Sequence, residues 1–119
     1  MIHYNLWFNL KDAGDRGGLK TICSFLDGLY ADGEIEAYRL LENRGSGGKT
    51  KLFRYHALIE FENDGQFSRA FSVQRERGIH NGLHGQVMAL VSEFQIEVFH
   101  QIAGTEPPPM LLRDYACQI

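Results

Sequence analysis

The pattern of apolar and polar residues divides the chain into strand-like and helix-like stretches. Apolar and polar residues alternate with a two-residue period over 2–10, 34–42, 51–63 and 92–101, which predicts four β-strands. Between these stretches, apolar residues recur at the spacing of one helix surface. The helical stripes are Leu19, Ile22, Cys23, Leu26, Leu29 and Tyr30 in the first case and Phe67, Ala70 and Phe71 in the second.

Residues that favour helix ends bracket both helical stretches. Asp15 is expected to cap the first helix, and Gly33 is expected to end it in the left-handed conformation. Asn63 or Asp64 is expected to cap the second helix. Residues 79–91 predict a further helical piece that glycines interrupt.

The resulting order, β-α-β-β-α-β, predicts an α+β fold of the ferredoxin-like type. Right-handed crossovers then place the helices on one face of a four-stranded antiparallel sheet. The strands at 2–10 and 51–63 are expected in the centre, and the less apolar strand at 34–42 at an edge. The predicted domain covers residues 1–102. Residues 103–119 form a C-terminal arm, in which prolines precede apolar residues, and we expect it to dock on a partner subunit.

The predicted sheet has one face towards the helices and one face that the helices leave open. The helix side carries the apolar set, which includes Phe94, Ile96 and Val98. The residues expected on the open face are His3, Asn5, Trp7, Asn9, Glu36, Tyr38, Leu40, Arg54, His56, Leu58, Glu60, Gln95, Glu97 and Phe99. Its apolar members expose too much area for a face in water, whereas isolated charges are costly to bury. Such a face suits a partly enclosed pocket or a satisfied interface between two sheets.

Composition and charge limit the classes of partner. The chain has 119 residues, of which 44% are hydrophobic and 23% charged, and its net charge is -3. A protein of this charge is not expected to bind nucleic acid. RNA-recognition domains share this order of elements, but the outward stacking positions here hold His56 and Leu58 instead of aromatic residues.

The chain carries no recognisable targeting or membrane segment. No apolar run approaches the roughly 20 residues of a membrane span, and the N-terminus lacks the basic start of a signal peptide. The two cysteines, Cys23 and Cys117, lie far apart and imply no disulfide framework. We therefore expect a cytoplasmic protein with no membrane partner.

The order of elements, the chain length, the mixed sheet face and the broken second helix resemble the dimeric α+β barrel superfamily. The chain is similar in particular to small uncharacterised bacterial proteins of dimeric ferredoxin-like fold, over residues 1–102. Members of the superfamily include cofactor-independent monooxygenases, decarboxylases, haem-degrading and haem-peroxidase enzymes, and stress proteins. The resemblance implies a homodimer with a pocket between sheet and helices, and we expect no cofactor.

Arg54 and His56 are the candidate catalytic residues, because they share the open face of a central strand. Arg54 can hold an anionic group, and His56 can move a proton near neutral pH. The alternative is a structural network of ion pairs and hydrogen bonds with Glu36, Glu60 or Glu97. No nucleophile lies nearby in the sequence, which favours that alternative.

The candidate ligand-binding residues surround this pair on the same face. They are Trp7, Asn5, Tyr38, Glu60, Glu97 and Phe99. Trp7 can stack on an aromatic ligand or belong to a dimer core, and the Tyr38 hydroxyl can reach the mouth of a pocket. The expected ligand is a small anionic or aromatic molecule.

Two short motifs are weak as functional sites. His80 and His84 lie four residues apart, as metal ligands on a helix do, but the glutamate of the zinc-protease motif is absent. Residues 45–50, GSGGKT, lack the earlier glycine of a phosphate-binding loop and precede a strand. The histidines are therefore weak candidates for a metal or haem site, and the glycine-rich stretch is interpreted as a hairpin loop.

These observations leave three hypotheses for function. In the first, a homodimer closes a pocket on its open sheet faces and acts as a cofactor-independent enzyme of the monooxygenase kind. In the second, the same pocket binds a ligand without turnover. In the third, the mixed face is only a satisfied dimer interface.

Overall fold

The computed structural model describes residues 1–45, 53–77 and 82–105. The strands are β1 (Ile2–Leu10), β2 (Ala37–Glu42), β3 (Tyr55–Phe61) and β4 (Val91–His100). The helices are α1 (Arg16–Ala31), α2 (Asp64–Arg77) and α3 (Gly82–Leu90). The predicted order of elements is confirmed, with the second helical region divided into two helices.

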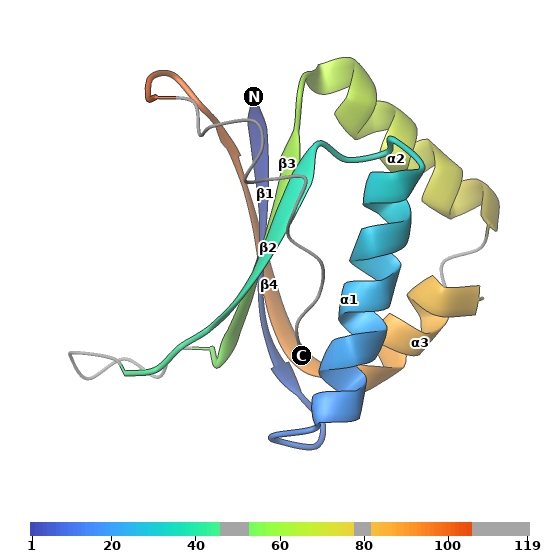
Figure 1. Ribbon diagram of the computed structural model, residues 1–119, viewed down its shortest axis with the longest axis vertical. Helices are drawn as coiled ribbons and strands as arrows, with labels where there is room; N and C mark the ends of the chain where they lie inside the picture. Colours follow the sequence, from blue (N-terminus) through green and yellow to red (C-terminus); the bar gives the residue numbers. More distant parts are fainter. Residues whose placement is uncertain (46–52, 78–81, 106–119) are drawn as a thin grey trace.

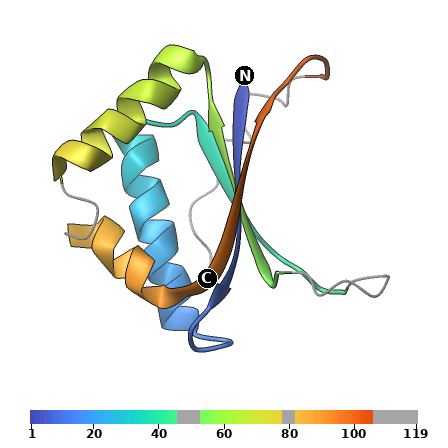
Figure 2. The same cartoon turned by 180° about the vertical axis from the view of Figure 1, so that it is seen from behind.

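The four strands form one antiparallel sheet in the spatial order β2-β3-β1-β4. β1 and β3 are therefore central, and β2 and β4 are the edges, as the ferredoxin-like arrangement requires. Figure 1 shows the helices on one side of the sheet, and the view from behind in Figure 2 shows no described helix on the other side. The predicted α+β architecture is confirmed.

Local hydrogen bonds fix both ends of α1. The Asp15 carboxylate accepts a hydrogen bond from the backbone N–H of Gly18 at 2.9 Å, so Asp15 caps the helix. Gly33 adopts a φ of 73°, and the next N–H, that of Glu34, donates to the carbonyl of Leu29 at 2.9 Å. Glycine adopts this left-handed conformation without a steric penalty. Both predicted ends of the first helix are confirmed.

Polar side chains join the start of α2 to the turn after α1. The Asn63 side chain accepts a hydrogen bond from the Gln66 N–H at 2.9 Å, which makes Asn63 the capping residue. The buried Gln66 amide in turn accepts from the Glu62 N–H at 2.7 Å and donates to the Gly33 carbonyl at 3.1 Å. The oxygen and the nitrogen of the buried Gln66 amide therefore both have hydrogen-bond partners, so its burial leaves neither group unsatisfied.

The core fills the space between the helices and the central strands. Its buried side chains are Ile2, Phe8, Leu10, Leu19, Ile22, Leu26, Leu29, Ile35, Tyr55, Ala57, Ile59, Phe61 and Ala70. Phe8 and Ile35 are the largest of those that are fully buried. Every second side chain of β3 is buried, from Tyr55 to Phe61, which confirms the alternation predicted for this strand.

The prediction for the two faces of β2 is wrong. Tyr38 and Leu40, expected on the open face, pack against the core on the helix side. The Tyr38 hydroxyl donates a hydrogen bond to the Asp27 carboxylate of α1. Arg39 and Leu41 take the open face instead. Tyr38 therefore leaves the set of candidate ligand residues on the open face.

A bend before β2 explains the reversal. The sequence pattern treats residues 34–42 as one strand, but the strand begins only at Ala37, after a bend at Glu36. Ile35 and Tyr38, three residues apart, therefore both contact the core. A slip of one residue moves every later side chain of a strand to the opposite face.

The helix side of β4 is much more exposed than its apolar sequence predicts. Phe94, Ile96 and Val98 are all exposed to solvent, and Phe94 is 57% exposed. α3 leads directly into β4 at Leu90 and Val91, so it covers only the beginning of the strand. The side predicted for these residues is confirmed, but the helices leave this edge of the sheet less covered than the central strands.

Several sequence features lie outside the described residues. They are His80, the side chain of His84, most of the glycine-rich loop and the C-terminal segment 106–119. Within the described part of the chain, no helix has the length and apolar character needed to cross a membrane. The cytoplasmic location stays a prediction.

Candidate functional site

Side chains of the open face meet in rows across the sheet, because directly paired residues point to the same side. The rows, read from β4 to β2, are Phe99–His3–Glu60–Ala37, Glu97–Asn5–Leu58–Arg39 and Gln95–Trp7–His56–Leu41. Each row places polar side chains beside apolar ones. The face therefore has the mixed character that the sequence predicts, with Arg39 and Leu41 in the places expected for Tyr38 and Leu40.

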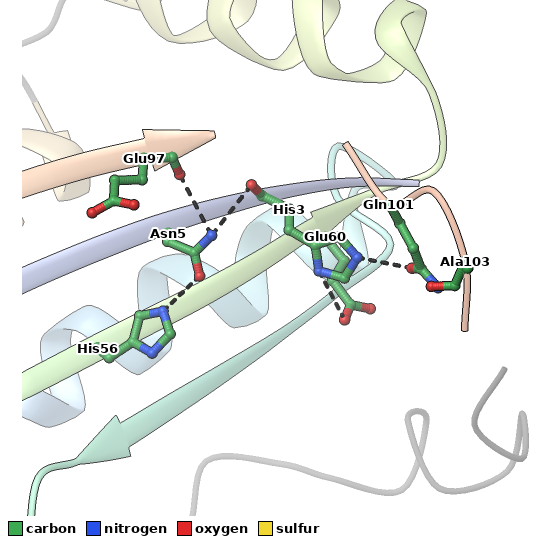
Figure 3. Close-up of polar contacts among 7 residues, drawn as sticks. All are labelled: His3, Asn5, His56, Glu60, Glu97, Gln101 and Ala103. Atoms are coloured by element: carbon green, nitrogen blue, oxygen red, sulfur yellow. Dashed lines mark hydrogen bonds and ion pairs between the residues drawn. The ribbon is translucent and has the colours of Figure 1, made fainter. Parts of the chain in front are cut away.

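Asn5 is the centre of the first polar cluster. Although polar, it is only 7% exposed. Its side-chain oxygen lies 2.7 Å from His56 Nε2, and its amide nitrogen donates longer bonds to the backbone carbonyls of His3 and Glu97, at 3.4 and 3.5 Å. Figure 3 shows His56 of β3 turned towards Asn5 of β1. His56 and Asn5 thus satisfy each other within one chain.

The His56 ring also stacks on Trp7. The ring centroids are 3.7 Å apart and the planes differ by 11°. Burial by these neighbours lowers the pKa of His56, because desolvation disfavours the charged imidazolium. His56 is therefore neutral at pH 7 and is held by a ring and an amide. This arrangement fits a structural role for His56 better than a role in which it carries a proton during catalysis.

Arg54 does not join this cluster. It lies just before β3, and its guanidinium pairs with the Glu42 carboxylate of β2 at 3.3 Å, near the surface. Its backbone N–H donates to the Asn9 side chain at 2.9 Å. The expected partners Glu36, Glu60 and Glu97 are replaced by Glu42, so the two candidate catalytic residues belong to separate networks.

A second polar cluster lies at the start of β1 and includes Arg39 and Gln101, which the sequence did not indicate as site residues. His3 Nδ1 lies 3.7 Å from the Glu60 carboxylate, and His3 Nε2 lies 2.9 Å from the Gln101 side-chain oxygen. Figure 3 shows His3 between these two partners. Together with Arg39 they line an open hollow of about 750 Å³. Only the strand register reveals this group, because its members are distant in the sequence.

The remaining candidates on the open face have lesser roles. The Glu97 carboxylate accepts a hydrogen bond from the Gln95 amide at 3.1 Å on the same strand. Phe99 is 52% exposed at the edge. Both side chains lie on the open face as expected. No contact among the described residues joins either of them to the His56 side chain.

A separate cavity of about 330 Å³ lies between the sheet and the helices. Its volume is at the lower end of the range of roughly 300–1,000 Å³ for small-molecule pockets. The described residues that line it are Tyr4, Leu6, Ile22, Phe25, Leu26, Leu29, Ile35, Ala57, Ile59, Phe61, Ala70, Phe71, Gln74, Val87, Met88, Val91, Ser92, Phe94 and Ile96. Nearly all of these are apolar, and they come from every described helix and from β1, β3 and β4.

Three polar side chains interrupt the apolar wall of this cavity. They belong to Tyr4, Gln74 and Ser92. Burial raises the pKa of Tyr4, so its phenol stays protonated at neutral pH. The amide nitrogen of Gln74 is buried and has no hydrogen-bond partner among the described residues. Such an orphaned donor is unfavourable by about 1–3 kcal/mol, and an acceptor in the cavity would remove that penalty.

The described residues form no metal centre. No group of three or more His, Cys, Asp or Glu side chains converges within the ranges that the structure describes. His80 and the side chain of His84 lie outside the described part of the structure, so the suggestion that they hold a metal stays a prediction. Cys23 is buried in α1, on the core side as expected, and is not bound in a disulfide.

Comparison with solved structures shows the fold shared with other small proteins. The protein At3g17210 from Arabidopsis thaliana superposes on this chain with a TM-score of 0.67 at 7% sequence identity. The match covers 89% of this chain and 100% of At3g17210. A dimeric ferredoxin-like protein of unknown function from Jannaschia sp. CCS1 gives 0.62 at 15% identity, covering 84% and 98% of the two chains. Another from Thermobifida fusca gives 0.59 at 15%, covering 84% and 90%. The similarity to small bacterial proteins of this fold is confirmed.

Comparison at the level of sequence identifies one family. No curated protein sequence matches the chain at a significant level. A family model does match, and it covers residues 1–109, which include all of the described strands and helices. The chain therefore belongs to DUF6614, a family of unknown function.

Proposed function

We propose that this protein is a homodimeric binding protein for a small apolar molecule, which it holds in the cavity between the sheet and the helices. The observation that carries the proposal is the unpaired Gln74 amide beside an otherwise apolar cavity. Apolar walls supply affinity, and a few polar groups supply orientation. The preferred ligand is an aromatic or aliphatic molecule with one carbonyl-type acceptor.

The side-chain geometry of Gln74 suits this role. Its buried amide nitrogen has no hydrogen-bond acceptor among the described residues, so a ligand acceptor would not compete with an existing bond of that nitrogen. A ligand carbonyl in the cavity that Gln74 lines would accept from this N–H.

The lining of the cavity favours binding over acid–base catalysis. Apart from the phenol of Tyr4, the described lining residues carry no titratable side chain, so none of them offers a general base. The histidines and carboxylates of the described chain that pair with each other lie on the opposite face of the sheet. We therefore place ligand binding on the helix side and self-association on the open side.

The composition of the open face supports the homodimer. Leu41 and Phe99 are exposed there, and Trp7 and Leu58 are half-buried. The polar side chains of Asn5, His56, His3 and Glu60 beside them already pair within the chain, so a second copy can cover this part of the face without leaving these groups unpaired. Similar proteins from Jannaschia and Thermobifida fusca are themselves dimeric.

Binding of two matched probes tests the ligand proposal. Acetylnaphthalene carries a carbonyl acceptor, and ethylnaphthalene is its hydrocarbon counterpart. We expect calorimetry to give a tighter dissociation constant for the ketone, by about 2- to 10-fold for one net hydrogen bond. Gln74→Leu should remove that preference while both probes still bind.

A cavity-filling variant tests whether the probes bind in the cavity. Val87→Phe adds a ring to a residue that lines the cavity and should weaken both probes. Val73→Phe makes the same change on α2 at a residue outside the lining and should leave both dissociation constants unchanged. Binding that survives Val87→Phe, or a ketone preference that survives Gln74→Leu, would contradict the proposal.

A further inference from the structure

The edge strand β4 lacks the features that usually protect the edge of a sheet. Figure 2 shows it as the near edge, and no described strand lies beyond it. Natural edge strands are often short or carry lysine or proline, because open backbone groups invite pairing with another chain. The other edge, β2, has six residues and carries Arg39 and Glu42. β4 has ten residues without lysine, arginine or proline, and it exposes Phe94, Ile96 and Val98. β4 is therefore the edge on which a further strand can pair.

The backbone of β4 presents a regular row of hydrogen-bonding groups along this edge. The Gln101 N–H donates to the Met1 carbonyl at 2.9 Å, and residues 93–100 pair with β1 without a break in register. In an antiparallel ladder, alternate residues direct their N–H and C=O groups to the same neighbour. Since Gln101 bonds to β1, the residues at even-numbered positions direct theirs away from the sheet. They include Phe94, Ile96 and Val98, the same residues whose apolar side chains are exposed.

On the helix side, the exposed side chains of β4 are complementary to a second copy of the strand. If two β4 strands run antiparallel about a twofold axis at Ile96, each Ile96 lies opposite its own copy and each Phe94 lies opposite a Val98. These are hydrogen-bonded pairs, because their backbone groups face outward. Pairs of aromatic and β-branched side chains stabilise antiparallel strands. The register pairs residues 92–100 of both copies, which is nearly all of β4.

The charges on the open side of β4 select this register. An axis at position 95 would set Glu93 against Glu97, and an axis at position 97 would set Glu97 against its own copy. Like charges directly opposite each other are destabilising. Axes at positions 94 and 98 avoid this but leave fewer residues of β4 paired. The axis at Ile96 instead sets Glu97 against Gln95, whose amide can donate to a carboxylate.

We infer that β4 pairs antiparallel with β4 of a second copy of this chain, about a twofold axis at Ile96, so that the two sheets become continuous. The pairing satisfies the outward backbone groups and removes the exposed apolar side chains from water. Phe94 also lines the cavity between the sheet and the helices, so the pairing brings Val98 of the partner subunit beside that cavity. The pairing itself needs neither a ligand nor the open-face contact. Only its effect on the cavity and the formation of assemblies larger than a dimer rest on the proposed function.

Single cysteines on β4 test the register in the full-length protein with Cys117→Ser, in which the remaining thiol, Cys23, is buried. Ile96→Cys places two thiols at a hydrogen-bonded pair, where the Cα atoms lie about 5.5 Å apart and a disulfide can form. Phe94→Cys and Val98→Cys are the matched controls on the same side, each about 14 Å along the strand from its own copy. Under a mild oxidant, we expect an interchain disulfide of Ile96→Cys at a yield at least about ten times that of either control.

The two control proteins also test the pairing of unlike positions. Mixed in equal amounts, Phe94→Cys and Val98→Cys should form a disulfide with each other, although neither forms one with itself. Equal yields for the three single variants, no disulfide for Ile96→Cys, or no mixed disulfide would overturn the inference.

Sedimentation of proteins without engineered thiols gives an independent readout. Ile96→Glu sets two carboxylates against each other on the axis and should remove the species larger than a dimer that the wild type forms as its concentration rises. Ile96→Val, the matched control at the same position, should retain them. Self-association that is the same in the wild type and Ile96→Glu at every concentration would overturn the edge pairing. Because neither readout uses a cavity ligand, failure of the inference is distinct from failure of the naphthalene binding test.

Discussion

The helix side and the open side of the sheet share the same four strands but place polar atoms differently. On the helix side, polar groups are sparse, and Gln74 is left without a partner beside an apolar cavity. On the open side, polar groups are frequent and several are paired, as Asn5 with His56 and His3 with Glu60, while the buried indole nitrogen of Trp7 has no partner among the described residues. Unpaired groups are available to a ligand, whereas paired groups stabilise a surface that can meet its copy. This contrast supports the proposal that the helix side binds a ligand and the open side mediates assembly.

The largest expected effect is on stability, and it reflects how the helices cover the central strands of the sheet but not β4. Phe8 and Phe94 are direct partners on β1 and β4, yet Phe8 is fully buried and Phe94 is 57% exposed. Phe8→Ala should lower the free energy of unfolding by about 3–5 kcal/mol, because it leaves a cavity in the core. Phe94→Ala should lower it by about 1 kcal/mol or less. Urea denaturation of both variants checks the difference, and equal losses would show that the edge is as well packed as the centre.

The next effect concerns assembly through the open side. Leu58 lies at the centre of that face, between Asn5 and Arg39 in the strand register. Leu58→Glu places an unpaired carboxylate in the proposed interface and should raise the dimer dissociation constant at least about 100-fold. Ile96→Glu, on the helix side, is the matched control and should leave the dimer intact. Analytical ultracentrifugation measures both, and a monomeric wild-type protein would refute the proposed assembly.

A smaller effect concerns the proton on His56. Burial lowers its pKa in the folded state from the ordinary value of 6.5, so the unfolded chain binds the proton more strongly. Above that value both states are neutral, and stability does not depend on this group. As the pH falls through 6.5, the unfolded state is protonated first and stability decreases.

A conservative variant isolates this contribution. His56→Gln keeps an amide that can bond with Asn5 but has no proton to gain. Urea denaturation from about pH 8 to pH 5.5 should therefore show a steeper loss of stability for the wild type than for His56→Gln. Parallel pH profiles for the two proteins would mean that His56 titrates alike in the folded and unfolded states.

The smallest effect is expected for Arg54. Its ion pair with Glu42 lies near the surface, so Arg54→Ala should change the free energy of unfolding by less than about 1 kcal/mol. It should also leave the dissociation constants of both naphthalene probes unchanged, since Arg54 does not line the cavity. A large loss of probe binding would restore Arg54 as a ligand-binding residue and weaken the contrast between the two sides.

Local patterns in the sequence predict much of the fold. The alternation of β3, the Asp15 cap and the Gly33 stop each depend on a few neighbouring residues, and all are confirmed. The faces of β2 are not predicted, because a single bend at Glu36 shifts the alternation by one residue. The exposure of Phe94 is also missed, since alternation shows which side a residue faces but not whether a helix covers it.

The site is less predictable because it depends on contacts between distant residues. The open face is identified, but His56 pairs with Asn5, and Glu60 pairs with His3, through a register that no local pattern specifies. The helix-side cavity is harder still. A cavity exists where side chains from several elements fail to fill a space, and no single residue, Gln74 included, signals that in the sequence.

Methyl-labelled NMR with acetylnaphthalene tests the division between the two sides most directly. Leu6, Leu26 and Ile59 line the cavity, whereas Leu41 and Leu58 lie on the open face. We expect addition of the ketone to shift the methyl resonances of the first group and leave those of the second unchanged. Shifts centred on Leu41 and Leu58, with the cavity methyls unchanged, would place the ligand on the open face and contradict the account.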